Sequence, residues 1–461
     1  MADMADMAAP TPDVTPASAP WPRPRQAWYA VAIFATALMV NFLDRGILNL
    51  LVEPIKRDLH LSDLQISLLM GFAFACFYVI LGLPIARLAD SRSRRAIVGT
   101  GIAIFSVMTA LCGLAQSFWQ LFLCRVGVGV DEACNGPATF SMLADLFPPA
   151  KLPRAIGVLN FGFVFGLGTS LLIGGTVVHL VSALPPVTLP LVGLLRPWQY
   201  AFFLVGIPGL IVAALFSTVL EPIRRGRITG PAAPTGRRLA TVPVRDVVRF
   251  AWGNRATYGP LFAGVALQTV LAFGIQSWTP SFFIRTYGWT IAQIGWTQGL
   301  IILIAWPLAL LPGGMAAEWL TRRGYPDANM RVAIAALLAY TPFAIAFPLM
   351  PTALGSNIMI GLSGFCISFG IGPLNAALQV VTPGEMRGQV TALFLFVFNI
   401  IGFGLGSTIV ALFTQYVFGS DALLRYSLST TVAILAPIAA LVMASGLKAY
   451  GRSVVRARSW V

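Results

Sequence analysis

Five ionisable side chains stand inside long apolar stretches of this sequence, two in one stretch and three in another. They are Asp44, Arg45, Arg125, Asp131 and Glu132. A charge near the centre of a bilayer costs about 2.5–3.5 kcal/mol on insertion scales, so such residues are retained for a reason. Intramembrane carboxylates that face a cavity usually mark a proton or ion path, and a guanidinium binds anionic groups. The five residues therefore predict proton-linked movement of a molecule through a membrane.

Three of these residues are placed to act together. At a rise of about 1.5 Å per residue, Asp44 lies about 9 Å and Arg125 about 10 Å below the same surface, so the two can pair. Glu132 follows on the same helix face as Arg125, whereas Asp131 points about 100° away, toward either water or a neighbouring polar helix. We expect Asp44 and Glu132 each to take up and release a proton during transport. We expect Arg125 to bind either Asp44 or an anionic group of the substrate. In the alternative, Asp44 and Arg125 form a buried pair that only fixes helix packing, with Glu132 satisfied by water or backbone.

No enzyme motif accompanies these residues. The sequence has no Gly-rich phosphate loop with a lysine and no metal-binding cluster, and His60 and His179 lie far apart. The five cysteines lack disulfide or metal spacing and are expected to act as small apolar residues. We therefore expect no enzyme activity and no cofactor. The absence of a nucleotide-binding domain favours an ion gradient as the energy source.

The elements that position the charged residues are apolar blocks long enough to cross a bilayer as helices. The chain has 461 residues, of which 57% are hydrophobic and 10% charged, whereas a typical soluble protein is about a quarter charged. We predict an all-α membrane protein with twelve transmembrane helices, at 28–50, 65–89, 95–115, 118–146, 153–181, 199–219, 258–286, 292–316, 330–350, 355–381, 387–415 and 424–448.

The basic residues are divided unevenly between the loops on the two sides of these helices. Of the 31 Lys and Arg residues, 24 fall on the side of the termini and 5 on the other, with Arg45 and Arg125 inside helices. This bias follows the positive-inside rule and predicts that both termini are cytoplasmic, in a bacterial-type inner membrane. The net charge of +14 is then a topology signal and an attraction to anionic lipid. Nucleic acid is not expected as a partner.

A long polar stretch divides the twelve helices into six and six. Its last part, Val244 to Trp252, is expected to form a short amphipathic helix at the membrane surface. The N-terminal residues lack the basic and apolar regions of a signal peptide. We predict a disordered cytoplasmic tail at 1–26, an N-terminal six-helix bundle at 27–220, a cytoplasmic linker at 221–257, a C-terminal six-helix bundle at 258–450 and a basic cytoplasmic tail at 451–461.

The two halves repeat each other. Residues 86–95 and 314–323 both carry a small residue, an acid four positions later, and paired arginines four and five positions beyond the acid. Gly-Leu-Gly-Thr at 166–169 is matched by Gly-Leu-Gly-Ser at 404–407. Duplication at half length is typical of transporters built from parallel repeats, of which the major facilitator superfamily is an example.

The first repeated loop resembles the major facilitator motif Gly-x-x-x-Asp-Arg-x-Gly-Arg-Arg, with Ala86, Ser91 and Ser93 in place of its first Gly, its Arg and its second Gly. This resemblance covers essentially the whole chain and implies the major facilitator fold, with two six-helix bundles.

Four short motifs in the first half resemble the spinster-like transporters of this superfamily. They are Asn41-Phe-Leu-Asp44-Arg45, Arg125-x-x-x-Gly129-x-x-Glu132-Ala, Ala144-Asp145-Leu-Phe and Glu221-Pro-x-x-Arg225-Gly226. Asp131 stands where that family usually has Gly, and Gln199 where an Arg is usual. The resemblance implies transport of lysophospholipids or sphingolipids.

The resemblance also implies gating roles for the repeated loops, which would brace the two halves when the cytoplasmic side is shut. Asp90 would lie at the N-terminus of the eleventh helix, where the helix dipole favours an anion. The alternative is that these charges are solvated. The expected gating residues are Asp90, Arg94, Arg95, Glu318 and Arg322.

Uncharged polar residues within the helices complete the predicted cavity. We expect substrate to contact Arg125 together with Asn160, Gln268, Gln276, Asn375 and Asn399. Alternatively each amide, like that of Gln298, only joins helix to helix. A charged first half beside a polar, uncharged second half suits an amphipathic substrate in a monomeric transporter. The rival hypothesis is a carrier that exports or imports small organic anions or drugs.

Overall fold

The computed structural model describes residues 21–73, 75–76, 84–85, 88, 92–148, 151–190, 193–223, 244–383 and 386–457. The first half contains α1 (Pro24–Leu50), α2 (Val52–Leu59), α3 (Asp63–Ser67), η1 (Leu68–Phe72), α5 (Arg94–Cys112), α6 (Phe118–Val128), α7 (Val130–Leu146), α8 (Leu152–Ser182), β1 (Val187–Leu189), β2 (Gly193–Leu195) and α9 (Pro197–Phe216). The strands pair as an antiparallel hairpin, with Val187 opposite Leu195.

The second half begins with α10 (Val244–Gly253), in agreement with the amphipathic helix predicted there. It continues with α11 (Arg255–Tyr287), α12 (Ile291–Arg322), α13 (Ala328–Ala346), η2 (Phe347–Leu349), α14 (Ala353–Val380), α15 (Arg387–Val397), η3 (Phe398–Phe403), α16 (Gly404–Leu412), η4 (Phe413–Val417), η5 (Asp421–Leu423), α17 (Leu424–Ser445) and α18 (Leu447–Ala457).

Ten helices in the described part of the chain are long and apolar enough to cross a membrane. They coincide with ten of the twelve predicted spans. The predicted span at 118–146 is helical but is interrupted at Gly129, where α6 ends and α7 begins. The predicted span at 65–89 begins as α3 and η1, and much of the remainder lies outside the described residues.

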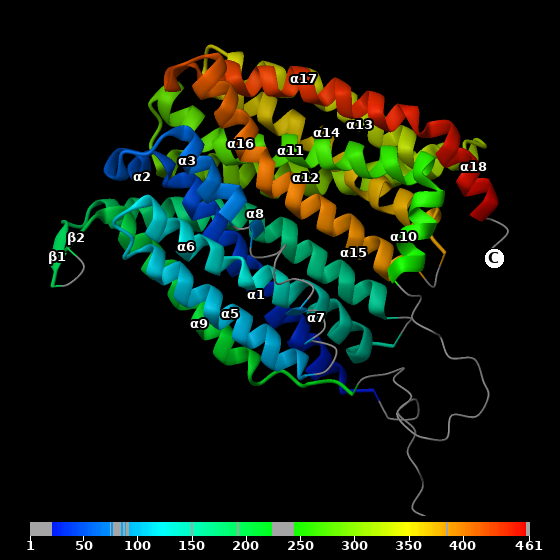
Figure 1. Ribbon diagram of the computed structural model, residues 1–461, viewed down its shortest axis with the longest axis horizontal. Coiled ribbons are helices and arrows are strands. Elements are labelled where there is room, and N and C mark those ends of the chain that lie inside the picture. Colours follow the sequence, from blue (N-terminus) through cyan, green and yellow to red (C-terminus); the bar gives the residue numbers. More distant parts are fainter. Residues whose placement is uncertain are drawn as a thin grey trace, which may run out of the picture.

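The helices form two bundles that lie against each other (Figure 1). One bundle holds α1 to α9 and has its own buried cluster, which includes Phe34, Phe105 and Phe216. The other holds α11 to α17 and has a separate cluster, which includes Leu261, Leu337 and Met443. Each half therefore buries its own apolar side chains.

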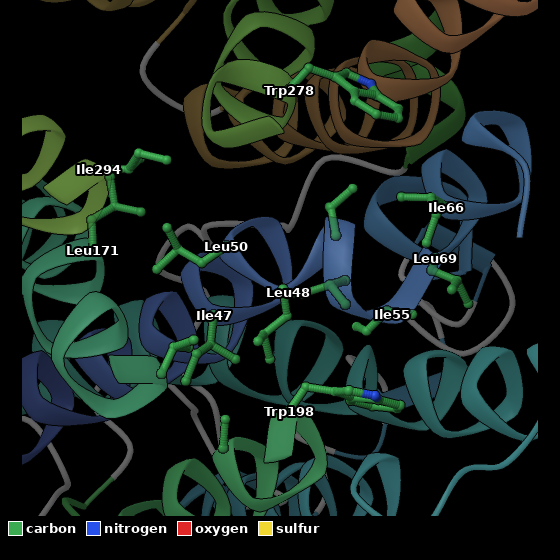
Figure 2. Packing of buried hydrophobic residues seen from close by; sticks show 14 of the residues in the cluster. Ile47, Leu48, Leu50, Ile55, Ile66, Leu69, Leu171, Trp198, Trp278 and Ile294 are labelled. Atoms are coloured by element: carbon green, nitrogen blue, oxygen red, sulfur yellow. The ribbon is translucent and has the colours of Figure 1, made fainter. Parts of the chain in front are cut away.

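A third buried cluster joins the two bundles, and it lies at one end of the molecule. It combines Leu48 and Ile55 of the first half with Trp278, Ile294 and Leu424 of the second. In Figure 2, Trp278 and Ile294 lie across from the side chains of α1 and α2. We call this end, which carries α2, α3, η5 and the hairpin, the closed end. The bundles contact each other here through packed side chains that exclude water.

Glycines allow the two backbones to approach closely toward the closed end. A Cβ on Gly295 of α12 would lie 2.5 Å from the carbonyl oxygen of Leu171 and 2.7 Å from Cα of Gly175, both in α8. A Cβ on Gly71 of η1 would lie 2.0 Å from the carbonyl oxygen of Phe403. Any larger side chain at these glycines would push the bundles apart.

The opposite end carries α10 and α18 (Figure 1), and we call it the basic end. The basic tail predicted from residue 451 is helical as far as Ala457, as part of α18, which starts two residues after α17 ends. Tyr450, Val454 and Ala457 recur at helical spacing and are buried against the second bundle. This apolar stripe makes the segment a packed helix.

Candidate functional site

Asp44 and Arg125 form a fully buried ion pair, as the sequence predicts. Arg125 donates from Nη1 to Oδ2 of Asp44 at 2.7 Å, and their side chains are 1% and 0% exposed. Thr109 of α5 donates to the other carboxylate oxygen of Asp44 at 2.9 Å. Both oxygens of Asp44 are therefore occupied, whereas Nε of Arg125 is buried without a hydrogen-bond partner among the described residues.

Glu132 pairs with the neighbouring arginine of α1. Arg45 donates from Nη2 to Oε2 of Glu132 at 2.7 Å, with side chains that are 15% and 27% exposed. Arg125 and Glu132 both contact α1, which agrees with the prediction that they lie on the same helix face. Their partners, Asp44 and Arg45, are adjacent residues of α1. The sequence places Arg45 inside a helix but predicts no separate role for it. The helix is interrupted at Gly129 between α6 and α7, and a helix-periodicity argument does not include such a break.

Asp131 faces a polar helix, which is one of the two alternatives predicted for it. Asn41 of α1 donates from Nδ2 to Oδ2 of Asp131 at 3.0 Å, and both residues are buried. The other oxygen of Asp131 has no hydrogen-bond partner among the described residues. The first half therefore contains three carboxylates and two guanidiniums clustered around α1.

A small pocket lies between the bundles beside this cluster. Its lining includes Arg45, Arg125 and Phe42 from the first half, and Gln276 and Phe403 from the second. The guanidinium of Arg45 lies over the Phe403 ring at 4.5 Å, a favourable cation–π distance. The pocket has about 40 Å³ of water-accessible space. In this conformation the pocket has room for a few water molecules.

The remaining predicted substrate residues are spread along the second half. Gln268 is buried and its Oε1 has no partner among the described residues. Asn399 is half-buried in η3, and Asn375 of α14 is exposed. Asn160 belongs to α8, and its side chain lies outside the described part of the structure. Gln298 donates to Asn357 at 2.5 Å and so joins α12 to α14.

The predicted gating arginines are held within single bundles in this conformation. Arg94 is buried and donates to Asp145 at 2.5 Å and to Glu221 at 3.1 Å, all in the first half. Burial raises the pKa of Glu221, but the backbone N–H of Arg95 and the side chains of Ser93 and Arg94 donate to it and bring that pKa below its usual value.

The other predicted gating residues make no contact between the bundles that the structure describes. Arg322 donates to Glu318, one turn earlier in the same helix, at 2.5 Å, and both side chains are mostly exposed. Asp90 lies outside the described residues.

An ion-pair network at the closed end links the bundles and was not predicted from the sequence. Arg285 of α11 donates from Nη1 and Nη2 to the two oxygens of Asp63 at 2.8 Å each, and from Nε to Glu53 at 2.8 Å. Lys56 of α2 contacts Asp63 at 2.6 Å and also pairs with Asp421 of η5. In the sequence these residues look like ordinary charged residues of loops. The one feature that could have indicated an ion-pair network is the crowding of opposite charges around 53–63.

Burial raises the pKa of the Asp63 carboxyl, but the hydrogen bonds and positive charges of Arg285 and Lys56 bring that pKa below its usual value. Asp63 precedes the predicted second span and so lies outside the membrane-spanning segment. The carboxylate therefore stays ionised at neutral pH, and it ties Arg285 of one bundle to α2 and α3 of the other.

Comparison with known proteins agrees with this geometry. Residues 34–407 match the family described as Major Facilitator Superfamily. The chain is 28% identical over 395 residues to an MFS-type efflux pump of Mycolicibacterium smegmatis, covering 85% of each chain. It is 23% identical over 370 residues to a probable L-galactonate transporter of Escherichia coli, covering 78% of this chain and 77% of that protein. These relatives are transporters, as expected from the lack of enzyme motifs.

The predicted resemblance to spinster-like transporters is confirmed. The chain is 21% identical over 325 residues to the protein spinster of Drosophila melanogaster, covering 69% of this chain and 50% of that protein. Among solved structures, it resembles a bacterial homologue of the human lysosomal transporter Spinster in an inward-facing and unoccupied conformation. The TM-score is 0.75 at 22% identity, with 95% of this chain and 99% of that chain covered.

Proposed function

Because this chain belongs to the Major Facilitator Superfamily, we propose that it is a proton-coupled secondary active transporter that works by alternating access. It acts as a monomer in a bacterial-type inner membrane. The basic end is cytoplasmic, since 24 of the 31 Lys and Arg residues fall on that side. The closed end faces outward, and the chain adopts an inward-facing conformation.

The distribution of contacts between the bundles supports alternating access. The shared buried cluster and the hydrogen bonds of Lys56, Ser67 and Arg285 across the interface all lie toward the closed end. At the basic end, the described gating residues contact only their own bundle. In the opposite conformation, Asp90 and its repeat partner Glu318 brace the basic end while the ion-pair network at the closed end separates.

The proposal of proton coupling rests on the two ion pairs that join α1 to α6 and α7. With every group ionised, the buried cluster has two positive and three negative charges, counting Asp131. A surplus negative charge is costly in a low-dielectric interior, and one proton cancels it. Glu132 is the most accessible of the three carboxylates, at 27% exposed. The surplus charge is that of Asp131, which has no ion-pair partner among the described residues. Because Glu132 is the most accessible, we assign the first exchange of a proton with water to it, and the second to Asp44 when its contact with Arg125 opens.

Protonation controls which guanidiniums are available to substrate. When Glu132 takes up a proton, Arg45 loses its ion pair with Glu132, and both Arg45 and Arg125 line the pocket between the bundles. A phosphate or carboxylate is a favourable ligand for two guanidiniums. The apolar Phe42 and Phe403 beside them suit an acyl chain. The substrate is accordingly an amphipathic anionic or zwitterionic molecule of the lysophospholipid or sphingolipid kind.

The second candidate substrate is a small organic anion or drug without an acyl chain. The similarity to a probable L-galactonate transporter and to an efflux pump favours it. The same arginines would bind the carboxylate of such a substrate. The two candidates differ in whether the substrate has an acyl chain that must contact apolar side chains of the protein.

Transport by purified protein in proteoliposomes tests these proposals. Uptake of a lysophospholipid, of galactonate and of a cationic drug is measured with and without an imposed pH gradient. Glu132→Gln keeps the side-chain shape but cannot titrate. We therefore expect gradient-driven uptake to fall to the background of empty liposomes, while exchange of labelled for unlabelled substrate continues.

Asp246→Asn is the matched control, because Asp246 pairs with Arg249 on exposed α10, far from the cluster. It should transport as the unmodified chain does. Normal pH-gradient dependence in Glu132→Gln would contradict the coupling role of this carboxylate. Uptake of galactonate without uptake of lysophospholipid would replace the first substrate class by the second.

A further inference from the structure

A groove of about 680 Å³ opens at the basic end, outside the transport site. One wall is the face of α18 that carries Leu447, Lys448, Gly451, Arg452 and Val455. The other wall is the turn Tyr325–Asp327 with Arg331 of α13. Tyr450 donates its hydroxyl proton to the carbonyl oxygen of Ala377 at 3.2 Å on the opposite face of α18. The helix that forms the groove is therefore anchored to the bundle.

The groove lies where two apolar spans end. The span that contains α17 ends at Ser445, two residues before α18 begins at Leu447. The span of α13 begins at Ala328, immediately after the Tyr325–Asp327 turn. Both walls of the groove therefore stand at the level where lipid tails give way to headgroups.

The charges of the groove are unbalanced. Arg331 donates to Asp327 at 2.7 Å, so this buried carboxylate neutralises one cation. Lys448 and Arg452 lie one turn apart on α18, and neither has an ion-pair partner among the described residues. Like charges four residues apart on a helix repel each other. An anion between them removes this repulsion and lies close to the positive end of the α13 dipole.

We propose that this groove binds the phosphate headgroup of an anionic phospholipid from the leaflet at the basic end. Lys448 and Arg452 contact the phosphate, and the free edge of the Arg331 guanidinium contributes a third cation. Leu447 and Val455 line the same groove, and Val455 is 55% exposed. These apolar side chains contact the glycerol and the upper acyl chain, which a free phosphate lacks.

Native mass spectrometry of the purified full-length protein tests this site. Bound phosphatidylglycerol is compared with bound phosphatidylcholine at equal lipid concentration. Lys448→Gln with Arg452→Gln should lower the affinity for phosphatidylglycerol by roughly thirtyfold, because each basic residue near an anionic lipid contributes about a factor of five. Binding of phosphatidylcholine should change little. Arg245→Gln with Arg249→Gln removes the same amount of charge from α10 and should leave the preference for phosphatidylglycerol over phosphatidylcholine unchanged.

A steric pair of variants tests the site without removing charge. A Cβ on Gly451 would lie 3.7 Å from Cγ of Pro326, which is ordinary contact, so Gly451→Ala should bind as the unmodified protein does. Gly451→Trp fills the groove and should abolish the preference. An unchanged preference in Lys448→Gln with Arg452→Gln, or in Gly451→Trp, would overturn the proposal. Displacement of phosphatidylglycerol by an equal concentration of inorganic phosphate would overturn its assignment to a lipid.

Discussion

Arg285 holds the closed end together, and its removal should open that end. Its guanidinium makes two 2.8 Å hydrogen bonds to Asp63 and one to Glu53, with only 9% of its side chain exposed. Arg285→Gln keeps a polar side chain but removes the charge and the fork geometry. Asp63, which is 1% exposed, would then keep only Lys56 as a cationic partner.

The size of the effect follows from this burial. Breaking a buried ion pair by removing one partner costs about 3–5 kcal/mol. Lys56 still compensates Asp63 in part, so the lower limit of about 3 kcal/mol applies. Once the closed end opens, water hydrates Asp63, and the free-energy cost of burying this carboxylate without Arg285 disappears. The substitution should therefore shift the equilibrium toward opening of the closed end by roughly a hundredfold, since 1.4 kcal/mol is tenfold.

Distances between spin labels measure this equilibrium. Labels on Ala183→Cys, after α8, and Gln415→Cys, in η4, report on separation of the bundles at the closed end, in a background without the five native cysteines. Arg57→Gln is the matched control, because Arg57 is 81% exposed on the same side of the molecule. An unchanged distance distribution in Arg285→Gln, or the same shift in Arg57→Gln, would refute the role of this network.

The same labels test the pH dependence of the network. The pKa of Asp63 is lowered below its ordinary value of 3.8 at the closed end. A depressed carboxyl pKa stabilises the closed form above the ordinary pKa, and this stabilisation is lost only as the pH falls through the depressed value. With Glu132→Gln and Asp44→Asn in place, the label distances should therefore stay constant between about pH 5 and 8. A transition within that range would mean that another group controls the closed end.

Six further substitutions test the roles of the buried charges and of the glycine contacts. Arg125→Ala should abolish binding of an anionic substrate, measured by isothermal titration calorimetry, and Arg125→Lys should restore it only partly because the planar fork is lost; full binding by Arg125→Ala would show that Arg125 is structural. Asp44→Asn leaves Arg125 buried without this partner and should lower the free energy of unfolding by about 3 kcal/mol, measured as a lower midpoint of thermal unfolding. Asp131→Gly should transport normally. Gly295→Ala places a Cβ 2.5 Å from the carbonyl oxygen of Leu171 and should open the closed end in the spin-label assay, whereas Gly314→Ala meets open space and should have no effect.

Much of the architecture was accessible from the sequence because it depends on one-dimensional quantities. Span positions follow from the length of apolar runs, and ten of the predicted spans coincide with helical segments long and apolar enough to cross a membrane. The Asp44–Arg125 pair was also accessible, since depth along a helix is a count of residues. Likewise the duplicated loops and the helix 1 and helix 4 motifs carried the family resemblance.

The tertiary structure alone decided which charges meet. Glu132 pairs with Arg45, and Asp131 accepts a hydrogen bond from Asn41, because α7 packs against α1. Arg285, Asp63 and Asp421 are more than a hundred residues apart in the chain, and only docking of the two bundles brings them together. Helix rotation and bundle docking are set by side-chain packing across the interface, which residue counting along the chain does not contain.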